Sequence, residues 1–135
     1  MSSNAAEAMF EADEATRSLG IALSEFGDGR AVASMRVSGA MVNGHAIAHG
    51  GYVFLLADTA FAYACNSRGP VTVAAGAEVS FVAAARLGDV LVATAEERTR
   101  YGRNGIYDVT VRRDDTVIAE FRGRSRAIEK DGAEK

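Results

Sequence analysis

Residues 51–66 are apolar on almost every side when they are wound as a helix, and no other segment constrains the fold as strongly. A helix of this kind must be buried on all sides. The side predicted to face a sheet carries Val53, Leu56, Ala57, Ala60 and Ala64. The opposite side carries Phe54, Leu55, Asp58, Phe61, Ala62 and Cys65. In a chain of 135 residues, we expect a second copy of the protein to cover that opposite side.

The later segments alternate between apolar and polar residues, as strands do, and they are separated by Gly and Asp turns. The expected strands span 21–26, 30–37, 72–83, 89–102, 105–114 and 116–129. Residues 41–50 have no clear period and are expected to form a loop. The economical packing of these parts is an α+β fold in which one long antiparallel sheet wraps around the apolar helix.

A short amphipathic helix is predicted at the N-terminus, over residues 4–18. Asn4 and Glu7 have the spacing of a capping box, and Gly20 is expected to end the helix. The helical period turns three side chains toward the core, namely Ala6, Met9 and Phe10.

Composition excludes several classes of protein. The net charge of -3 and pI near 5.4 argue against non-specific nucleic-acid binding, which needs a basic excess. The one cysteine, Cys65, cannot form an intrachain disulfide, so a reducing compartment is expected. The N-terminus lacks the apolar region of a signal peptide, and the apolar helix is too short to span a bilayer. We therefore expect residues 1–135 to form a single cytoplasmic domain without membrane or nucleic-acid partners.

The carboxylate of Asp58 is the one charge within the apolar helix, and no basic residue lies near it in sequence. Burial of an unpaired carboxylate costs free energy and raises its pKa. Such groups cluster at functional sites, but a structural acid bonded to a nearby backbone group or hydroxyl has the same pattern. The hydroxyls available for that structural role belong to Thr59, Thr72 and Ser80.

The start of the helix is a second candidate feature. A helix that begins at Gly50 and Gly51 presents free N–H groups and the positive end of its dipole, which together can bind an oxyanion. The absence of side chains lets a substrate carbonyl approach closely. The alternative is that the two glycines only relieve a tight turn from loop to helix.

Gly50 and Asp58 are eight positions apart, which is about 12 Å along a helix axis. Two groups that act on one carbonyl must both lie within about 3–4 Å of it. One helix cannot meet that condition. Two antiparallel helices across a two-fold axis can, because Gly50 of one chain then lies near Asp58 of the other. If both residues are catalytic, the site is shared between subunits and occurs twice per dimer.

The motifs along the chain resemble one known family. They are Asn43, "HGG" at 49–51, "LADTAFAYACNS" at 56–67, "GDVLVATA" at 88–95, "GIYDV" at 105–109 and "FRGRS" at 121–125. This pattern resembles the hotdog-fold acyl-coenzyme A thioesterases of the phenylacetic acid degradation (PaaI) type. The resemblance implies a hotdog fold over residues 1–135, edge-to-edge homodimers that usually pair into homotetramers, and hydrolysis of an aryl-acetyl-CoA. It implies no cofactor, since coenzyme A is part of the substrate.

The resemblance also implies roles for individual residues. Asp58 would be the nucleophile or the base that activates water, and the Gly50 amide would polarise the thioester carbonyl. Asn43 would position water or the carbonyl, and His49 would have a supporting role. The acyl pocket would be lined by Phe54, Phe61 and Phe81. The further substrate-binding residues, several of them near the coenzyme A phosphates, would be Gly51, Thr72, Arg100, Gly102, Arg103, Asn104 and Arg126.

Other chemistries fit the sequence less well. No G-x-S-x-G motif is present, and Cys65 has no basic activator in its apolar run. His45 and His49 lack the H-E-x-x-H pattern, so no metal site is predicted. Two alternatives to the thioesterase stay open: a non-catalytic acyl-CoA-binding sensor of the same fold, and a hotdog dehydratase in which His49 works with Asp58 of the other chain.

Overall fold

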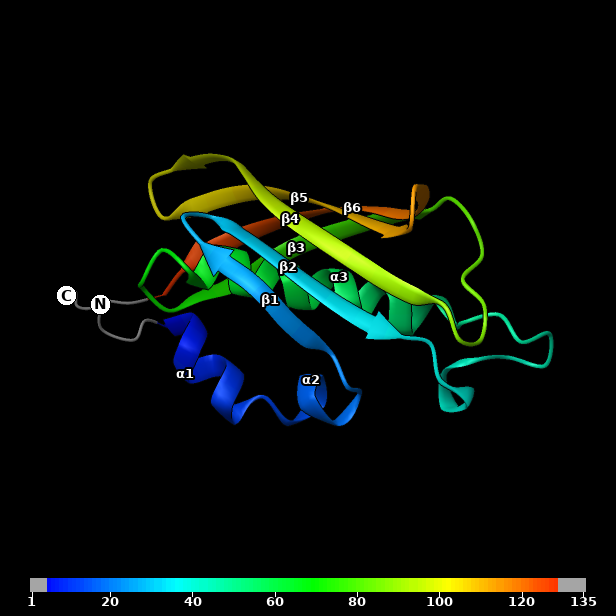
Figure 1. Ribbon diagram of the computed structural model, residues 1–135. Coiled ribbons are helices and arrows are strands. Elements are labelled where there is room, and N and C mark those ends of the chain that lie inside the picture. Colours follow the sequence, from blue (N-terminus) through cyan, green and yellow to red (C-terminus); the bar gives the residue numbers. More distant parts are fainter. Residues whose placement is uncertain (1–4, 129–135) are drawn as a thin grey trace.

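The computed structural model describes residues 5–128, which form one antiparallel sheet curved around a long helix (Figure 1). The helical elements are α1 (Ala5–Ala12), α2 (Glu14–Ser18), a 3-10 turn (Gly39–Met41) and α3 (Gly50–Asn66). The strands are β1 (Ala22–Gly27), β2 (Arg30–Arg36), β3 (Thr72–Phe81), β4 (Val90–Tyr101), β5 (Asn104–Arg113) and β6 (Thr116–Ala127). Their order in the sheet is β1-β2-β4-β5-β6-β3. The predicted α+β architecture is confirmed.

Tight turns with positive φ angles set the register of the sheet. Asp28 and Gly29 link β1 to β2 with φ angles of 53° and 80°, as a type I′ hairpin turn requires. Gly102 begins the β4–β5 turn with a φ of 60°, and Asp114 begins the β5–β6 turn with a φ of 52°. These are the Gly and Asp positions at which the sequence predicted hairpins.

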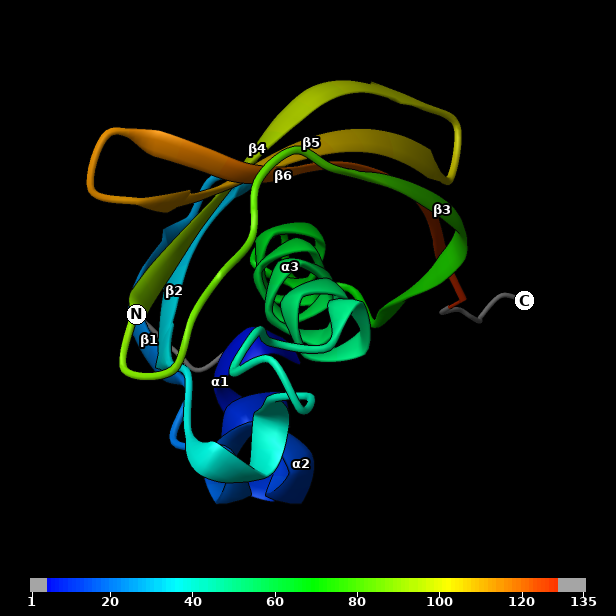
Figure 2. The same cartoon turned by 90° about the vertical axis from the view of Figure 1, so that its right-hand side faces the viewer.

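Helix α3 lies inside the curl of the sheet, where Figure 2 shows it end-on. Its buried side includes the residues predicted to face the sheet, but it extends further round the helix than predicted. Phe61 and Cys65 were assigned to the side with Asp58, and both are instead buried. The Phe61 ring packs against Phe121 and Tyr107, with each pair of ring centroids 5.7 Å apart. The curved sheet therefore covers the flank of α3 as well as its face.

The predicted helix over 4–18 is divided into α1 and α2 at Asp13. The Asp13 carboxylate accepts hydrogen bonds from the Thr16 amide at 3.0 Å and from the Thr16 hydroxyl at 2.6 Å, so it caps α2. Met9 and Phe10 pack against the core as predicted, and Gly20 follows the last turn with a φ of 72°. The proposed capping box at Asn4 and Glu7, and the side chain of Ala6, lie outside the described residues.

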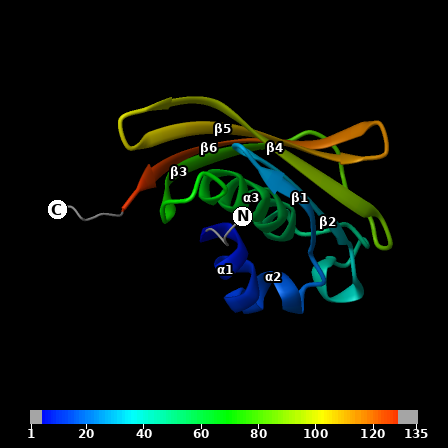
Figure 3. The same ribbon diagram turned by 60° about the vertical axis from the view of Figure 1, so that its left-hand side comes forward.

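The two N-terminal helices cover α3 on the side that the sheet leaves open (Figures 2 and 3). The Tyr63 hydroxyl of α3 donates a hydrogen bond of 2.9 Å to Asp13, and the Phe10 ring meets the Tyr63 ring edge-on at 5.9 Å. These contacts fix the N-terminal helices to α3. Among the described helices, none is long and apolar enough to cross a membrane.

Strand β3 forms one edge of the sheet, next to β6. Several large apolar side chains on this strand and at its ends are exposed to solvent, namely Val71, Val73, Phe81 and Val82. An edge strand presents unpaired backbone groups that another strand can bind. The β3 edge is therefore suited to pair with a second sheet.

Gly123 of β6 lies directly under the Phe61 ring, and this contact generates a stability prediction. A Cβ atom at position 123 would lie 2.7 Å from two ring atoms of Phe61, a side chain with no exposed surface. We expect Gly123→Ala to lower the free energy of unfolding by about 1–3 kcal/mol in a urea titration. Gly44→Ala is the matched control, because a Cβ there meets no atom within 4 Å. Equal stability of the two variants would contradict this packing.

Candidate active site

Asp58 lies halfway along α3, on the side turned away from the sheet, and its carboxylate is half-buried. It makes no hydrogen bond or ion pair with any residue of the described range 5–128. Burial raises the pKa of Asp58 above its ordinary value, and no neighbouring cation counteracts this. A carboxylate in this state is a stronger base than an exposed one, which suits it to attack or to proton abstraction.

The structural alternative for Asp58 required a backbone or hydroxyl partner, and within residues 5–128 no backbone amide donates to its carboxylate. The Thr59 hydroxyl donates instead to the Leu55 carbonyl at 2.8 Å, and the Thr72 hydroxyl donates to the Pro70 carbonyl at 3.0 Å. Ser80 is exposed on β3 and lines a hollow on the outer face of the sheet together with Arg98 and Arg122. None of the three hydroxyls considered is bonded to Asp58.

The groove that contains Asp58 runs between α3 and the N-terminal helices. One wall comes from α3 and the other from residues 9–16. Apart from Asp58, its lining is mostly apolar and includes Met9, Ala12, Ala15, Leu55 and Ala62. Sequence analysis identified Met9 as a core residue but gave no sign that this segment borders Asp58.

The loop before α3 is shaped by Asn43. Its side-chain oxygen accepts hydrogen bonds from the backbone amides of His45, at 2.8 Å, and Ile47, at 3.2 Å. The loop thereby folds back so that the His49 amide reaches the Met41 carbonyl at 2.9 Å. Asn43 thus has a demonstrable structural task, and its exposed side-chain NH₂ remains available as a donor.

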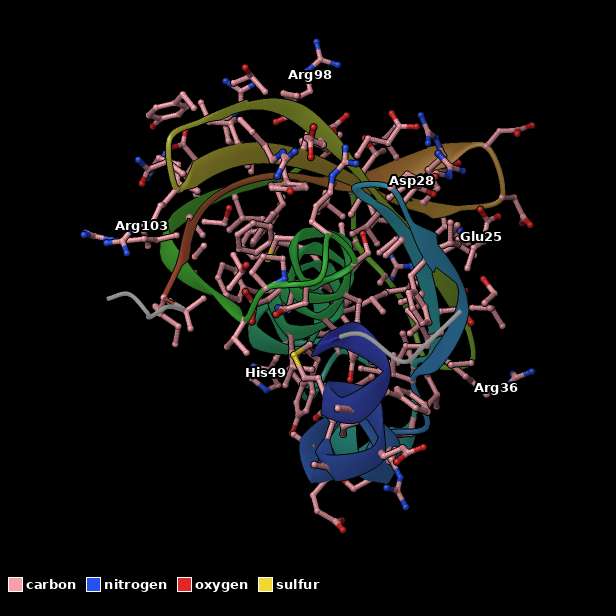
Figure 4. All side chains as sticks on the ribbon, turned by 90° about the vertical axis from the view of Figure 1, so that its left-hand side faces the viewer. Glu25, Asp28, Arg36, His49, Arg98 and Arg103 are labelled. Atoms are coloured by element: carbon pink, nitrogen blue, oxygen red, sulfur yellow. The ribbon has the colours of Figure 1, made fainter. Side chains whose placement is uncertain are left out.

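His49 is the N-cap of α3, but its side chain makes no capping hydrogen bond. Its imidazole is exposed and projects from the molecule in Figure 4. Gly50 is therefore the first helical residue, and its amide belongs to the first turn, where no intrahelical acceptor exists. No acceptor for this amide is found among the described residues.

Phe81 covers the position where Gly50 has no side chain. A Cβ atom on Gly50 would lie 2.9 Å from the tip of the Phe81 ring, whereas a Cβ on Gly51 would meet nothing within 4 Å. Gly50 and Phe81 line a second groove, which also includes Val53 and Ile118. The structure thus brings together two predicted site residues that are 31 positions apart in sequence.

Gly50 and Asp58 lie in different grooves of the chain. Helix α3 is continuous from Gly50 to Asn66, so the separation of about 12 Å along its axis applies. A single chain therefore does not bring the candidate oxyanion donor and the candidate carboxylate to the same carbonyl.

Several predicted coenzyme A contacts gather at the other end of α3. A small pocket there is lined by Thr72, Arg100, Gly102, Arg103 and Asn104. Arg126 lies opposite Asn104 in the β5–β6 ladder. Within the described range, Arg103 and Arg126 have no carboxylate partner, and Arg103 projects outward in Figure 4. Sequence analysis did not identify Arg68, which also lines this pocket and forms an ion pair of 3.0 Å with Glu97.

The three predicted aromatic pocket residues have different environments. Phe81 is exposed beside Gly50, and Phe54 is partly buried with its ring edge-on to Phe121 at 5.3 Å. Phe61 has 0% of its surface exposed, so its assignment to the acyl pocket is wrong. It belongs to the core beneath the sheet.

Other reactive groups are not set up for catalysis. Burial raises the pKa of the Cys65 thiol to about 12, so the thiolate is a minor species at neutral pH. No group of three or more His, Cys, Asp or Glu side chains in residues 5–128 is arranged to hold a metal ion.

Comparison with known proteins identifies the class. The sequence profile of the thioesterase superfamily matches residues 45–120, a range that includes His49, Gly50 and Asp58. The chain belongs to this superfamily, has its hotdog fold, and is a thioester hydrolase. The sensor and dehydratase alternatives are therefore not retained.

Individual relatives are similar over nearly the whole chain. The acyl-coenzyme A thioesterase PaaI of Escherichia coli (strain K12) is 44% identical over 124 residues, which cover 91% of this chain and 89% of the relative. The structure of the E. coli PaaI protein from the phenylacetic acid degradation operon superimposes with a TM-score of 0.89, at 42% identity, covering 92% of this chain and 91% of that one. The TT0310 protein of Thermus thermophilus superimposes with a TM-score of 0.82, at 32% identity, covering 86% of this chain and 98% of that one.

The isolated charge of Asp58 generates a prediction about stability and pH. Because burial raises the pKa of this carboxyl, ionisation of Asp58 destabilises the folded chain. The penalty is absent below the unfolded pKa, which lies near 3.9 for Asp, and complete above the raised folded value. We expect Asp58→Asn to raise the unfolding temperature at pH 7, with a gain that disappears as the pH falls toward 4. A stability loss at pH 7 would show that Asp58 has a stabilising partner.

Proposed function

We propose that this thioester hydrolase cleaves aromatic acyl-CoA thioesters, such as phenylacetyl-CoA or a ring-hydroxylated aryl-acetyl-CoA, to the free acid and CoA. The observation that carries the proposal is the half-buried carboxylate of Asp58, which has a raised pKa and no partner within residues 5–128. The 44% identity to an acyl-coenzyme A thioesterase supports the CoA thioester. The similarity to a protein from a phenylacetic acid degradation operon supports the aromatic acyl group.

A thioester is already activated, so a carboxylate and an oxyanion donor suffice without a triad. In one route, Asp58 attacks the carbonyl carbon, the C–S bond breaks, CoA leaves as a thiolate, and water hydrolyses the resulting mixed anhydride. In the other route, Asp58 takes a proton from the water that attacks the carbonyl, the C–S bond of the tetrahedral intermediate breaks, and the departing CoA thiolate takes up that proton. In both, the Gly50 amide donates a hydrogen bond to the oxygen that gains negative charge. His49 directly precedes this donor and Asn43 shapes the loop that leads to it, and in this proposal both assist in positioning.

The active unit in this proposal is a dimer. The exposed apolar side chains on β3 and its unpaired edge suit pairing with the same strand of a second chain, which would extend the sheet. Antiparallel α3 helices under that sheet would bring Gly50 of one chain to Asp58 of the other. Two such dimers would pair into a homotetramer.

The coenzyme A moiety is proposed to bind near the β4–β5 turn. The guanidinium groups of Arg100, Arg103 and Arg126 supply positive charge for its phosphates. Asn104, Gly102 and Thr72 border the same small pocket. Among the carboxylates of residues 5–128, one lies near these three arginines, namely Glu97 at 3.5 Å from Arg100, which supports the availability of Arg103 and Arg126 to a ligand.

Replacing the carboxylate tests the chemical role of Asp58. Asp58→Asn keeps the size of the side chain but removes its charge and basicity, so we expect kcat for phenylacetyl-CoA to fall by about 10²–10⁴-fold. Free thiol release would be followed with a chromogenic reagent, and CoA binding by calorimetry. Binding should be retained, because Asp58 lies outside the arginine-lined pocket. Hydrolysis at the wild-type rate by this variant would contradict the mechanism.

Two substitutions at Gly50 distinguish the role of its amide N–H from the role of its missing side chain. Gly50→Pro removes the N–H donor at a helix position where proline is well tolerated, and His49 already has the extended ψ of 139° that precedes proline. Gly50→Ala adds a Cβ toward Phe81 but keeps the donor. We expect kcat of the proline variant to be about 10²–10³-fold below that of the alanine variant. Similar kcat values for the two variants would exclude the Gly50 amide as the oxyanion donor.

A further inference from the structure

The groove beside Asp58 has a wall that the superfamily profile does not include. The profile begins at residue 45, whereas one wall of the groove comes from α1, Asp13 and α2. Met9, Ala12 and Ala15 present apolar side chains to the groove from this N-terminal wall. A feature that lies outside the shared catalytic region is suited to select a substrate and need not take part in the reaction.

The position of this wall is fixed relative to the carboxylate. Tyr63, on the same helix as Asp58, donates a hydrogen bond of 2.9 Å to Asp13. Burial alone would raise the pKa of Asp13, but hydrogen bonds from Thr16 and Tyr63 outweigh it and hold the pKa below its ordinary value. The Asp13 carboxylate is therefore ionised and accepts hydrogen bonds from Thr16 and Tyr63. Among the residues that line the groove, Asp58 is the one charged group without a partner.

The reaction requires an apolar surface at this place. The thioester carbonyl must come within about 3–4 Å of the Asp58 carboxylate. The CoA side of the thioester is long and carries charged phosphates, whereas the acyl side of an aromatic substrate is apolar. Within residues 5–128, the groove lined by Asp58 is bordered by Leu55 and Ala62 on α3 and by the N-terminal wall opposite. Its volume of about 550 Å³ falls in the range of small-molecule sites.

We propose that the acyl group of the substrate binds in this groove and that the N-terminal wall, through Ala12 and Met9, determines which acyl groups are accepted. The proposal rests on the proposed function, because it takes Asp58 as the group that meets the thioester. Ala12 ends α1 at the groove, so a larger side chain there reduces the space for an acyl group while Asp58 itself is unchanged.

The test compares Ala12→Leu with Ala8→Leu. Both change an exposed alanine of α1 to a residue of similar helix propensity, but Ala8 does not line the groove. Values of kcat/KM would be measured for acetyl-CoA, hexanoyl-CoA and phenylacetyl-CoA. We expect Ala12→Leu to lower the ratio of the phenylacetyl to the acetyl value by about tenfold or more. Ala8→Leu should leave the ratio within about twofold of wild type.

Each other outcome counts against a specific claim. A ratio that is unchanged in Ala12→Leu, or that falls equally in Ala8→Leu, would overturn the role of the N-terminal wall while leaving the thioesterase activity intact. If the wild-type chain prefers hexanoyl-CoA, the proposal of an aromatic acyl group is wrong. The role of the N-terminal wall is then tested by the ratio of kcat/KM for hexanoyl-CoA to kcat/KM for acetyl-CoA, and an unchanged ratio in Ala12→Leu would overturn that role. Hydrolysis of none of these thioesters by the wild-type chain would overturn the proposed function, and this inference with it.

Discussion

The burial of α3 is the constraint on which the rest of the structure depends. A helix that is apolar on almost every side gains stability only if it is covered on every side. The curved sheet covers its face and flanks, and the N-terminal helices cover part of what remains. The uncovered remainder is a stripe with Asp58 in its middle. The same shortage of cover that favours a second chain therefore leaves Asp58 half-buried, on the surface that the second chain would cover.

The rigidity of α3 also determines how the chemistry is divided. An α-helix fixes Gly50 and Asp58 at a separation that no side-chain rotation removes, since one group is a backbone amide and the other a short carboxylate. The Gly50 end of the proposed catalytic pair is held in place by two neighbouring side chains. The Asn43 side chain shapes the loop that leads into the helix start, and the Phe81 ring packs where Gly50 leaves room. A shared site is the arrangement that lets both ends act on one substrate.

Sequence patterns predicted most of the fold because the signals were local. The Asp28–Gly29 and Asp114 turns, the alternation of the strands and the apolar run of α3 each specify their structure through neighbouring residues. The break at Asp13 was missed because its cause is partly distant: the carboxylate binds Tyr63, 50 positions away. Phe61 was misassigned because a flank position on a helix is buried or open according to how far a sheet curves, which no local pattern records. The N-terminal wall of the Asp58 groove was missed for the same reason.

The shared site is the central claim, and complementation between two inactive chains tests it most directly. A chain with Asp58→Asn and a chain with Gly50→Pro would be co-expressed with different tags and purified through both tags in succession. In a mixed dimer, one site combines the intact Asp58 of one chain with the intact Gly50 of the other, and the second site has neither. The account predicts that mixed assemblies recover up to about half of the wild-type kcat, although each variant alone is inactive. Mixed dimers that form but stay as inactive as the separate variants would show that each site lies within one chain.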